Sequence, residues 1–215
     1  MKTTRNCSLV ILGDSYSTFE GCIPEGNYVY YPNPDIPDVA CADDTWWRQL
    51  IARRNLRLLM NDSFSGSTVS TRVRENHTVA DAFVSRMKNT LSAGGTGGEK
   101  PELILIFGGT NDSWIDNEVG SVQYGGWSEA DLKQVLPAFC SLLDYVIRCN
   151  PQAAVVGIVN SDIKPEIQSG IEEACAHYGA ASLRIRNISK INGHPDGLGM
   201  RQIAEQIDDF LNTVR

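Results

Sequence analysis

Residues 103–112 read Leu-Ile-Leu-Ile-Phe-Gly-Gly-Thr-Asn-Asp, five apolar residues that run directly into a polar turn. A short, continuous apolar run predicts a strand buried on both faces, as in a parallel sheet. The polar residues after Phe107 then lie at the carboxyl end of that strand. In open α/β sheets, ligands bind outside this end of the strands. We therefore expect the functional residues to follow the strands directly.

Four further stretches have the same character, and they predict strands at Ser8–Leu12, Leu56–Met60, Ala153–Val159 and Ser182–Ile185. Helical patterns lie between them, at Asp44–Arg54, at Val79–Leu91 and from Ser128 to Asn150, and the last helix follows Asp196. Strands that alternate with helices predict a mostly parallel sheet with helices on both faces. The length of 215 residues fits one domain over residues 1–215.

The third helical pattern has a clear start. Ser128-Glu-Ala-Asp131 is typical of a capping box, in which the serine hydroxyl and the acidic side chain satisfy two backbone N–H groups. Pro137 lies inside the apolar stripe that follows, so we expect a kink there. Asp196 is expected to cap the last helix.

Two long segments, near 20–45 and 113–127, have no helical or strand periodicity. The first contains Tyr28, Tyr30 and Tyr31, and the second contains Trp114, Tyr124 and Trp127. Long loops without structure of their own are usually functional or disordered, and the aromatic content favours function. The alternative is that these loops only cover apolar sheet edges.

Charge and composition exclude several classes of partner. Nineteen Lys and Arg against 26 Asp and Glu give a net charge of −7, which argues against nucleic acid and anionic membranes. No apolar run approaches the ~20 residues of a membrane span. The apolar stretch at the start is too short for a secretory signal, which predicts a cytoplasmic protein if Met1 is the natural start. The six cysteines are scattered without metal-ligand spacing, so we expect reduced thiols and neither a metal nor a cofactor.

The polar residues that follow the predicted strands form a set suited to acyl transfer. Ser15 follows the first strand, Gly66 the second and Asn111 the third, and His194 stands just before the last helix. A serine hydroxyl needs an adjacent base, and His194 is the candidate. His77, in the polar stretch RENHT, is typical of a solvated loop, and His177 lies near the end of a surface helix. The backbone N–H groups of Ser15 and Gly66 and the side-chain amide of Asn111 would stabilise the oxyanion.

These four segments resemble the blocks of the SGNH (GDSL-type) hydrolase superfamily, over residues 8 to 200. Ser15 matches the Gly-Asp-Ser block and Gly66 matches the glycine block. Asn111 matches the Gly-x-Asn-Asp block, and His194 matches the final His-Pro block. The resemblance implies a flavodoxin-like, three-layer α/β/α fold with five parallel strands in the order 2-1-3-4-5. It also implies an esterase or acyl-hydrolase activity, and the aromatic loop insertions look like those of bacterial members.

The sequence departs from the family at one catalytic position. The family usually has Asp three residues before the histidine, where this chain has Ile191. A backbone carbonyl could orient His194 instead, or Asp196 could do so, although Asp196 is well explained as a helix cap. Our hypothesis is a Ser15–His194 dyad.

Three functions remain open from the sequence. The leading one is a serine hydrolase that cleaves small acyl esters, with O-acetyl groups on carbohydrates as candidates. The partner would be a small-molecule or glycan ester, and the aromatic residues that could stack on it are Trp46, Trp114, Trp127 and Tyr124. The alternatives are a non-catalytic carbohydrate-binding protein on the same scaffold and an acyltransferase.

Overall fold

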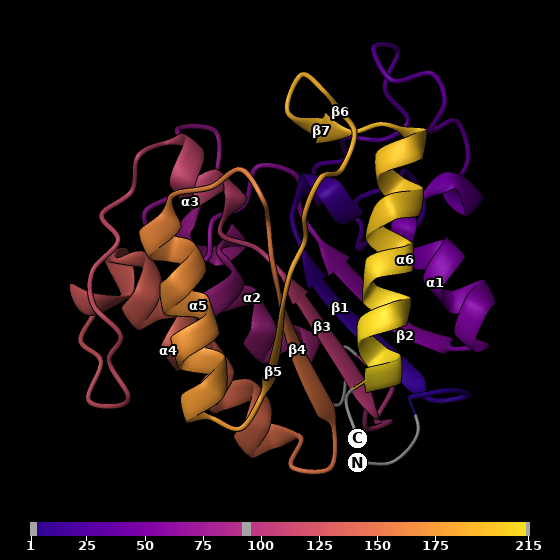
Figure 1. Cartoon of the computed structure of the whole chain (residues 1–215). Coiled ribbons are helices and arrows are strands. Elements are labelled where there is room, and N and C mark those ends of the chain that lie inside the picture. The colour runs from indigo at the N-terminus through magenta and orange to yellow at the C-terminus, as the bar shows by residue number, and fades with distance from the viewer. Residues whose placement is uncertain (1–3, 92–95, 214–215) are drawn as a thin grey trace.

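The computed structural model describes residues 4–91 and 96–213, and within them the chain forms a five-stranded parallel sheet covered by helices on both faces (Figure 1). The strand order is β2-β1-β3-β4-β5. The predicted fold class and strand order are therefore confirmed. No helix in these residues is long and apolar enough to cross a membrane.

The strands of the sheet are β1 (Ser8–Gly13), β2 (Arg57–Ser63), β3 (Leu103–Phe107), β4 (Ala154–Val159) and β5 (Ala181–Arg184). The α-helices are α1 (Trp46–Arg54), α2 (Phe83–Thr90), α3 (Thr110–Trp114), α4 (Val135–Cys149), α5 (Pro165–His177) and α6 (Gly197–Thr213). Short 3-10 turns are η1 (Ser15–Ser17), η2 (Ala42–Asp44), η3 (Val79–Asp81) and η4 (Asp131–Lys133). A two-stranded antiparallel hairpin, β6 (Lys190–Ile191) with β7 (His194–Pro195), was not expected from the sequence.

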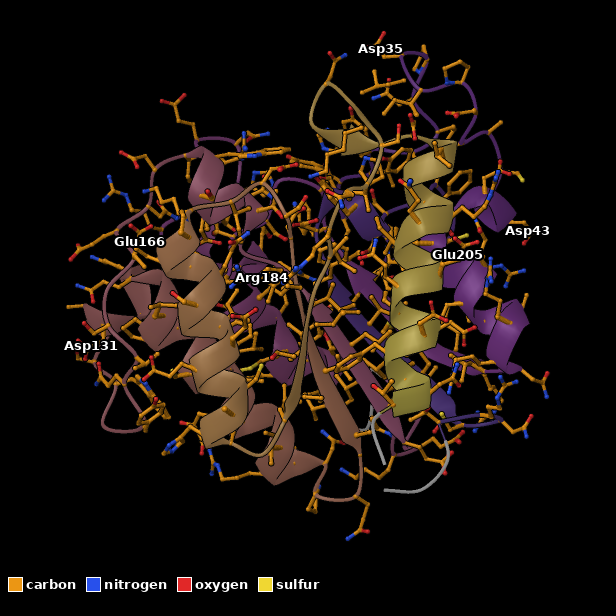
Figure 2. All side chains as sticks on the ribbon, in the orientation of Figure 1. Asp35, Asp43, Asp131, Glu166, Arg184 and Glu205 are labelled. Carbon is orange, nitrogen blue, oxygen red and sulfur yellow. The ribbon has the colours of Figure 1, made fainter. Side chains whose placement is uncertain are left out.

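Each face of the sheet contributes side chains to its own hydrophobic core. Leu103, Leu105 and Phe107 of β3 pack with α1 and α6 on one face. Ile104 and Ile106 point the other way, toward α2, α4 and α5. Because both faces are covered, successive residues of the strand are all apolar, which is why the pattern in the sequence is continuous. Charged side chains such as Asp43, Glu166 and Glu205 point away from the helices into solvent (Figure 2).

The kink expected at Pro137 is absent, and the reason lies in where the helix begins. Ser128 and Asp131 do form the predicted capping box, with Asp131 Oδ2 accepting from the Ser128 N–H at 2.8 Å and the Asp131 N–H donating to Ser128 Oγ at 3.3 Å. They close the turn over Ser128–Asp131 that leads into η4, and the chain then becomes extended at Gln134. Pro137 is consequently the third residue of α4. The N–H groups of the first turn have no partner within a helix, so proline costs nothing there.

A buried ion pair between Arg86 and Asp62 links the carboxyl ends of β1 and β2. Arg86 of α2 donates through Nη1 to Oδ1 of Asp62 at 2.5 Å. Through Nη2 it donates to the Gly13 carbonyl and to Ser67 Oγ, both at 3.2 Å. The Arg86 and Asp62 side chains are only 9% and 6% exposed. Arg86 thus joins the end of β1 to the loop after β2, which carries Gly66.

We expect Arg86→Met to destabilise the protein by about 3–5 kcal/mol, because it leaves the Asp62 carboxylate buried without its cation. Urea denaturation measures this loss. Arg57→Met is the control, since Arg57 pairs with Glu99 at an exposed position and such pairs contribute little. Equal shifts of the two unfolding midpoints would contradict this role for Arg86.

Candidate active site

Ser15 lies at the carboxyl end of β1, in a turn that the local sequence determines. Asp14 precedes the turn η1, and its Oδ1 accepts from the Tyr16 N–H at 3.1 Å. Gly13 is required immediately before, because a Cβ there would lie 2.4 Å from Ser63 Oγ and 2.7 Å from Ser17 Cβ. The backbone at Ser15 is therefore held in one conformation at this edge of the sheet, where the residue is buried.

The hairpin β6–β7 brings His194 to this serine. Nε2 of His194 lies 3.0 Å from Oγ of Ser15, although 179 residues separate the two in sequence. The turn of the hairpin is Asn192-Gly193, and both residues have positive φ, +50° and +80°. Asn-Gly is the preferred pair for a two-residue hairpin turn, so this pair is the one feature of the sequence that could have revealed the hairpin.

The same turn places a backbone carbonyl against the other ring nitrogen of His194. The Asn192 carbonyl oxygen lies 3.2 Å from Nδ1 of His194. Asp196 is occupied elsewhere, because its Oδ1 accepts from the Gly199 N–H at 2.8 Å and its Oδ2 accepts from Ser189 Oγ at 2.6 Å. Asp196 thus caps α6, as expected. The group that faces Nδ1 is the backbone carbonyl.

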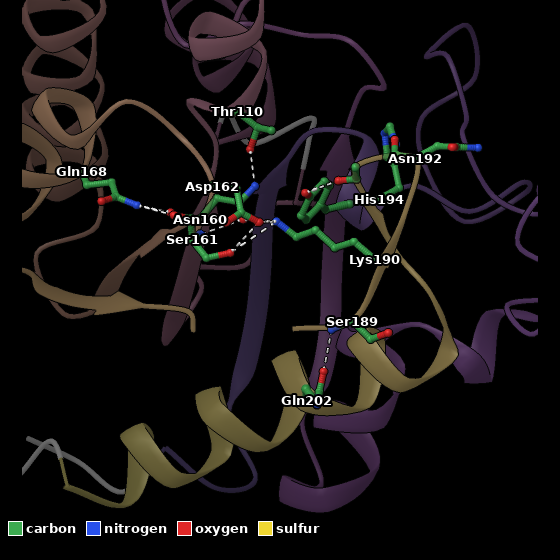
Figure 3. Close-up of polar contacts among 12 residues, drawn as sticks. Thr110, Asn160, Ser161, Asp162, Gln168, Ser189, Lys190, Asn192, His194 and Gln202 are labelled. Carbon is green, nitrogen blue, oxygen red and sulfur yellow. Dashed lines mark hydrogen bonds and ion pairs between the residues drawn. The ribbon is translucent and has the colours of Figure 1, made fainter. Parts of the chain in front are cut away.

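Lys190 anchors the hairpin to the end of β4 (Figure 3). Its Nζ donates to Asn160 Oδ1 at 3.0 Å and to Asp162 Oδ2 at 2.7 Å. Asn160 in turn donates through Nδ2 to Thr110 Oγ1 at 3.1 Å, which ties in the start of α3. Lys190 carried no recognisable signal in the sequence.

Two tyrosine hydroxyls bind the backbone of the hairpin. The hydroxyl of Tyr16 donates to the Gly193 carbonyl at 2.5 Å, and that of Tyr31 donates to the Pro195 carbonyl at 2.7 Å. Tyr30 stacks on the His194 ring with centroids 3.6 Å apart and planes 11° apart. The first aromatic loop therefore buries and orients the histidine, a more specific role than the sequence indicated.

Burial lowers the pKa of His194 to about 4. The hydrogen bond to Asn192 opposes this change, while the positive charges of Lys190 and Arg74 add to it. At neutral pH the imidazole is therefore uncharged. An uncharged imidazole that donates from Nδ1 to the Asn192 carbonyl has its Nε2 lone pair directed at Ser15.

Gly66 adopts φ +85°, which favours glycine. A Cβ at this position would also lie 2.6 Å from Cε1 of His77. His77 is buried, with Nε2 2.8 Å from the Ser65 carbonyl. The expectation that His77 lies in a solvated loop is therefore wrong, because the histidine packs under the glycine turn and supports it.

Asn111, in the first turn of α3, is buried and faces the same loop. Its Nδ2 donates to the Ser67 carbonyl at 3.0 Å. The neighbouring Asp112 accepts from the backbone N–H groups of Val69 at 2.7 Å and Ser70 at 3.2 Å. Asn111 and the Gly66 loop are thus fixed to one another at the edge of the sheet where Ser15 lies.

Of the four aromatic residues expected to bind substrate, only Trp114 lies at this site. Its ring is 5.3 Å from that of His194, and it is 41% exposed. Trp46 is fully buried and donates from Nε1 to the Tyr16 carbonyl at 3.1 Å. The substrate-binding role predicted for Trp46 is therefore wrong, because the residue is part of the core.

Tyr124 and Trp127 were also expected to bind substrate, and both lie away from the candidate site. Tyr124 stacks on His177, at the end of α5 remote from the carboxyl ends of the strands. Trp127 donates to the Gln123 carbonyl at 2.8 Å and packs against the core beside α4. Both residues pack on helices or the core that they cover, whereas the alternative considered for these loops was that they cover apolar sheet edges. Among the described residues, no group of three or more His, Cys, Asp or Glu side chains could hold a metal ion.

Because of its burial, we expect His194 to titrate with a midpoint near pH 4, well below 6.5, in an NMR titration of the ring protons. Ile191→Asp places a carboxylate beside the ring and should raise this midpoint. Ile191→Asn is the uncharged control and should leave it nearly unchanged. A midpoint at or above 6.5 in the unmodified protein would contradict the burial argument.

The whole chain resembles a known hydrolase family in sequence and in structure. Residues 7–211 match the model of the GDSL-like lipase/acylhydrolase family. A crystal structure of a GDSL-like lipase from Bacteroides ovatus is 36% identical with a TM-score of 0.88, covering 97% of this chain and 99% of that one. One from Bacteroides uniformis is 37% identical, also with a TM-score of 0.88 and 97% of each chain covered.

A more distant likeness extends to carbohydrate esterases. The structure of a carbohydrate acetylesterase from Sinorhizobium meliloti is 13% identical, with a TM-score of 0.66, over 97% of this chain and 100% of that one. At this identity the likeness concerns the fold alone. No curated protein sequence matches. The family model and the Bacteroides structures cover almost all of the chain, and this protein belongs to the GDSL-like lipase/acylhydrolase family.

Proposed function

We propose that this protein is a serine esterase that cleaves small acyl esters through an acyl-enzyme on Ser15. One observation carries the proposal: Nε2 of His194 lies 3.0 Å from Ser15 Oγ, while Nδ1 faces the Asn192 carbonyl. A nucleophile, a base and a group that orients the base are the three parts that covalent acyl transfer needs. Membership of a lipase/acylhydrolase family gives independent support.

The proposed reaction begins with neutral His194. Nε2 accepts the Ser15 proton as Oγ attacks the ester carbonyl carbon, and the carbonyl oxygen becomes an oxyanion. The backbone N–H groups of Ser15 and Gly66 and the side-chain amide of Asn111 would donate to it. His194 then gives its proton to the leaving alcohol, and water repeats these steps to release the acid.

Without a carboxylate, the dyad has a specific weakness. A backbone carbonyl fixes the tautomer and the ring orientation, but it adds no full negative charge to stabilise the imidazolium. We therefore infer a slower reaction than that of a Ser-His-Asp triad. The stacked Tyr30 ring offers partial compensation, because the face of an aromatic ring attracts a cation.

The proposed substrates are carbohydrates that carry small O-acyl groups. Trp114 presents an exposed ring beside His194, where it could stack on a sugar face. A carbohydrate acetylesterase among the distant structural relatives supports the proposal at the level of the scaffold.

The direct test is turnover of p-nitrophenyl acetate and labelling by a fluorophosphonate probe. Both should be lost in Ser15→Ala. Ser17→Ala is the matched control, because the Ser17 hydroxyl is fully buried and accepts from Trp46 Nε1 at 3.2 Å. Labelling that persists in Ser15→Ala and disappears in Ser17→Ala would overturn the assignment. Adding an acceptor sugar to the assay separates hydrolysis from acyl transfer, and a folded protein without turnover would indicate a binding function instead.

Asn111→Ala tests the oxyanion role separately. We expect kcat to fall by about 10²–10³ with little change in KM, because the amide acts where charge develops in the transition state. A circular dichroism melt of the variant checks that the Asn111–Ser67 contact is not essential for folding. A change confined to KM would show that Asn111 binds the ground-state substrate.

A further inference from the structure

The loop that carries Gly66 also carries a cation that the described part of the chain leaves unpaired. Arg74 is partly buried, and its Nε atom is fully buried without a hydrogen-bond partner. No ion pair involving Arg74 is formed among residues 4–91 and 96–213. Buried donors in folded proteins are nearly always satisfied, so a donor without a partner requires an explanation.

The Arg74 side chain lies beside Gly66, one of the proposed oxyanion donors. Its Cδ is 3.6 Å from the point that a Cβ on Gly66 would occupy. The turn that contains it is closed by the His77 N–H donating to the Arg74 carbonyl at 3.0 Å. His77 is in turn held at the Ser65 carbonyl, so the base of the Arg74 side chain is fixed relative to the oxyanion glycine. Its positive charge also acts on His194, whose pKa it helps to lower.

Other buried or partly buried arginines of the chain have acidic partners. Arg54 pairs with Asp208, Arg86 with Asp62 and Arg184 with Glu172. In a protein with a net charge of −7, an arginine without such a partner at the site edge is the exception. A guanidinium matches a carboxylate in shape, because its planar fork donates two parallel hydrogen bonds.

We propose that Arg74 binds a carboxylate of the substrate, so that the preferred substrates are acyl esters of acidic carbohydrates such as uronic acids. This inference rests on the proposed esterase function and names its substrate class. The carboxylate belongs to the alcohol part of the ester, because in an O-acetylated uronic acid the sugar that carries the carboxylate is also the leaving alcohol.

The experiment compares kcat/KM for O-acetylated glucuronic acid with that for O-acetylated glucuronamide, which has nearly the same shape and no charge. Acetate release is measured for both. The protein should prefer the acid by about 10- to 100-fold, as for a hydrogen-bonded ion pair. Arg74→Gln should bring the ratio close to one, and Arg74→Lys should retain part of it. Added salt should reduce the preference of the unmodified protein.

Arg72→Gln is the matched control, because Arg72 is an exposed arginine two residues away and its loss changes the net charge equally. It should leave the ratio as it is. A ratio near one in the unmodified protein, or a preference that survives Arg74→Gln, would overturn the role of Arg74. Turnover of p-nitrophenyl acetate with no preference for the acid overturns this inference alone. If nothing is turned over, the esterase proposal fails, and calorimetric binding of the acetylated acid to the protein and to Arg74→Gln still decides whether Arg74 holds the carboxylate.

Discussion

The contact between Ser15 Oγ and His194 Nε2 joins two ends of the chain, and much of the structure serves to keep it at 3.0 Å. Ser15 is fixed because β1 ends in Gly13, where any side chain would collide with Ser63 and Ser17. His194 belongs to a short hairpin that could not hold its position alone, since a two-stranded hairpin of this kind is unstable in isolation. Lys190 attaches the hairpin to the end of β4, and Tyr16 and Tyr31 bind its backbone carbonyls. The sheet edge, the hairpin and the first aromatic loop therefore act together as one support for this contact.

Ile191 stands where the resemblance to the SGNH hydrolases implies an aspartate, and its lack of charge affects the electrostatics of the site more than its geometry. The Asn192 carbonyl lies where it can accept from Nδ1, so the ring keeps one orientation. Burial and the nearby cations lower the pKa of His194 to about 4, whereas a carboxylate partner would raise it. In the proposed reaction this base would be uncharged and available at neutral pH but weaker, so proton transfer from Ser15 would have less driving force. Arg74, one of the two cations that lower this pKa, is also the group proposed to attract an anionic substrate, whereas Lys190 is already paired with Asp162.

The fold could be predicted from the sequence because both faces of the sheet are buried. Burial on both faces produces continuous apolar runs such as residues 103–107, and such runs can be recognised from the local sequence alone. Ser15, Gly66, Asn111 and His194 could be proposed because each follows a strand or precedes a helix in a recognisable block. The roles of Tyr30, Tyr31 and Lys190 could not, since they depend on where a long loop and a short hairpin meet in space. The substrate-binding role predicted for Trp46 is wrong for a related reason. Trp46 begins a helix that packs on the core, and the sequence does not show which residues of the first helical turn are buried. His77 was misjudged because its polar neighbours concealed its contact with the Ser65 carbonyl.

Whether His194 works without an acidic partner can be decided by the kcat/KM of Asp196→Asn. Asp196 is the acid closest to His194 in sequence, and asparagine also caps helices well, so the start of α6 should remain intact. We expect kcat/KM to stay within a few-fold of that of the unmodified protein, because the Asn192 carbonyl and not Asp196 orients the ring. A loss of orders of magnitude in a variant with an unchanged circular dichroism spectrum and melting temperature would refute the dyad, and would identify Asp196 as the third catalytic residue.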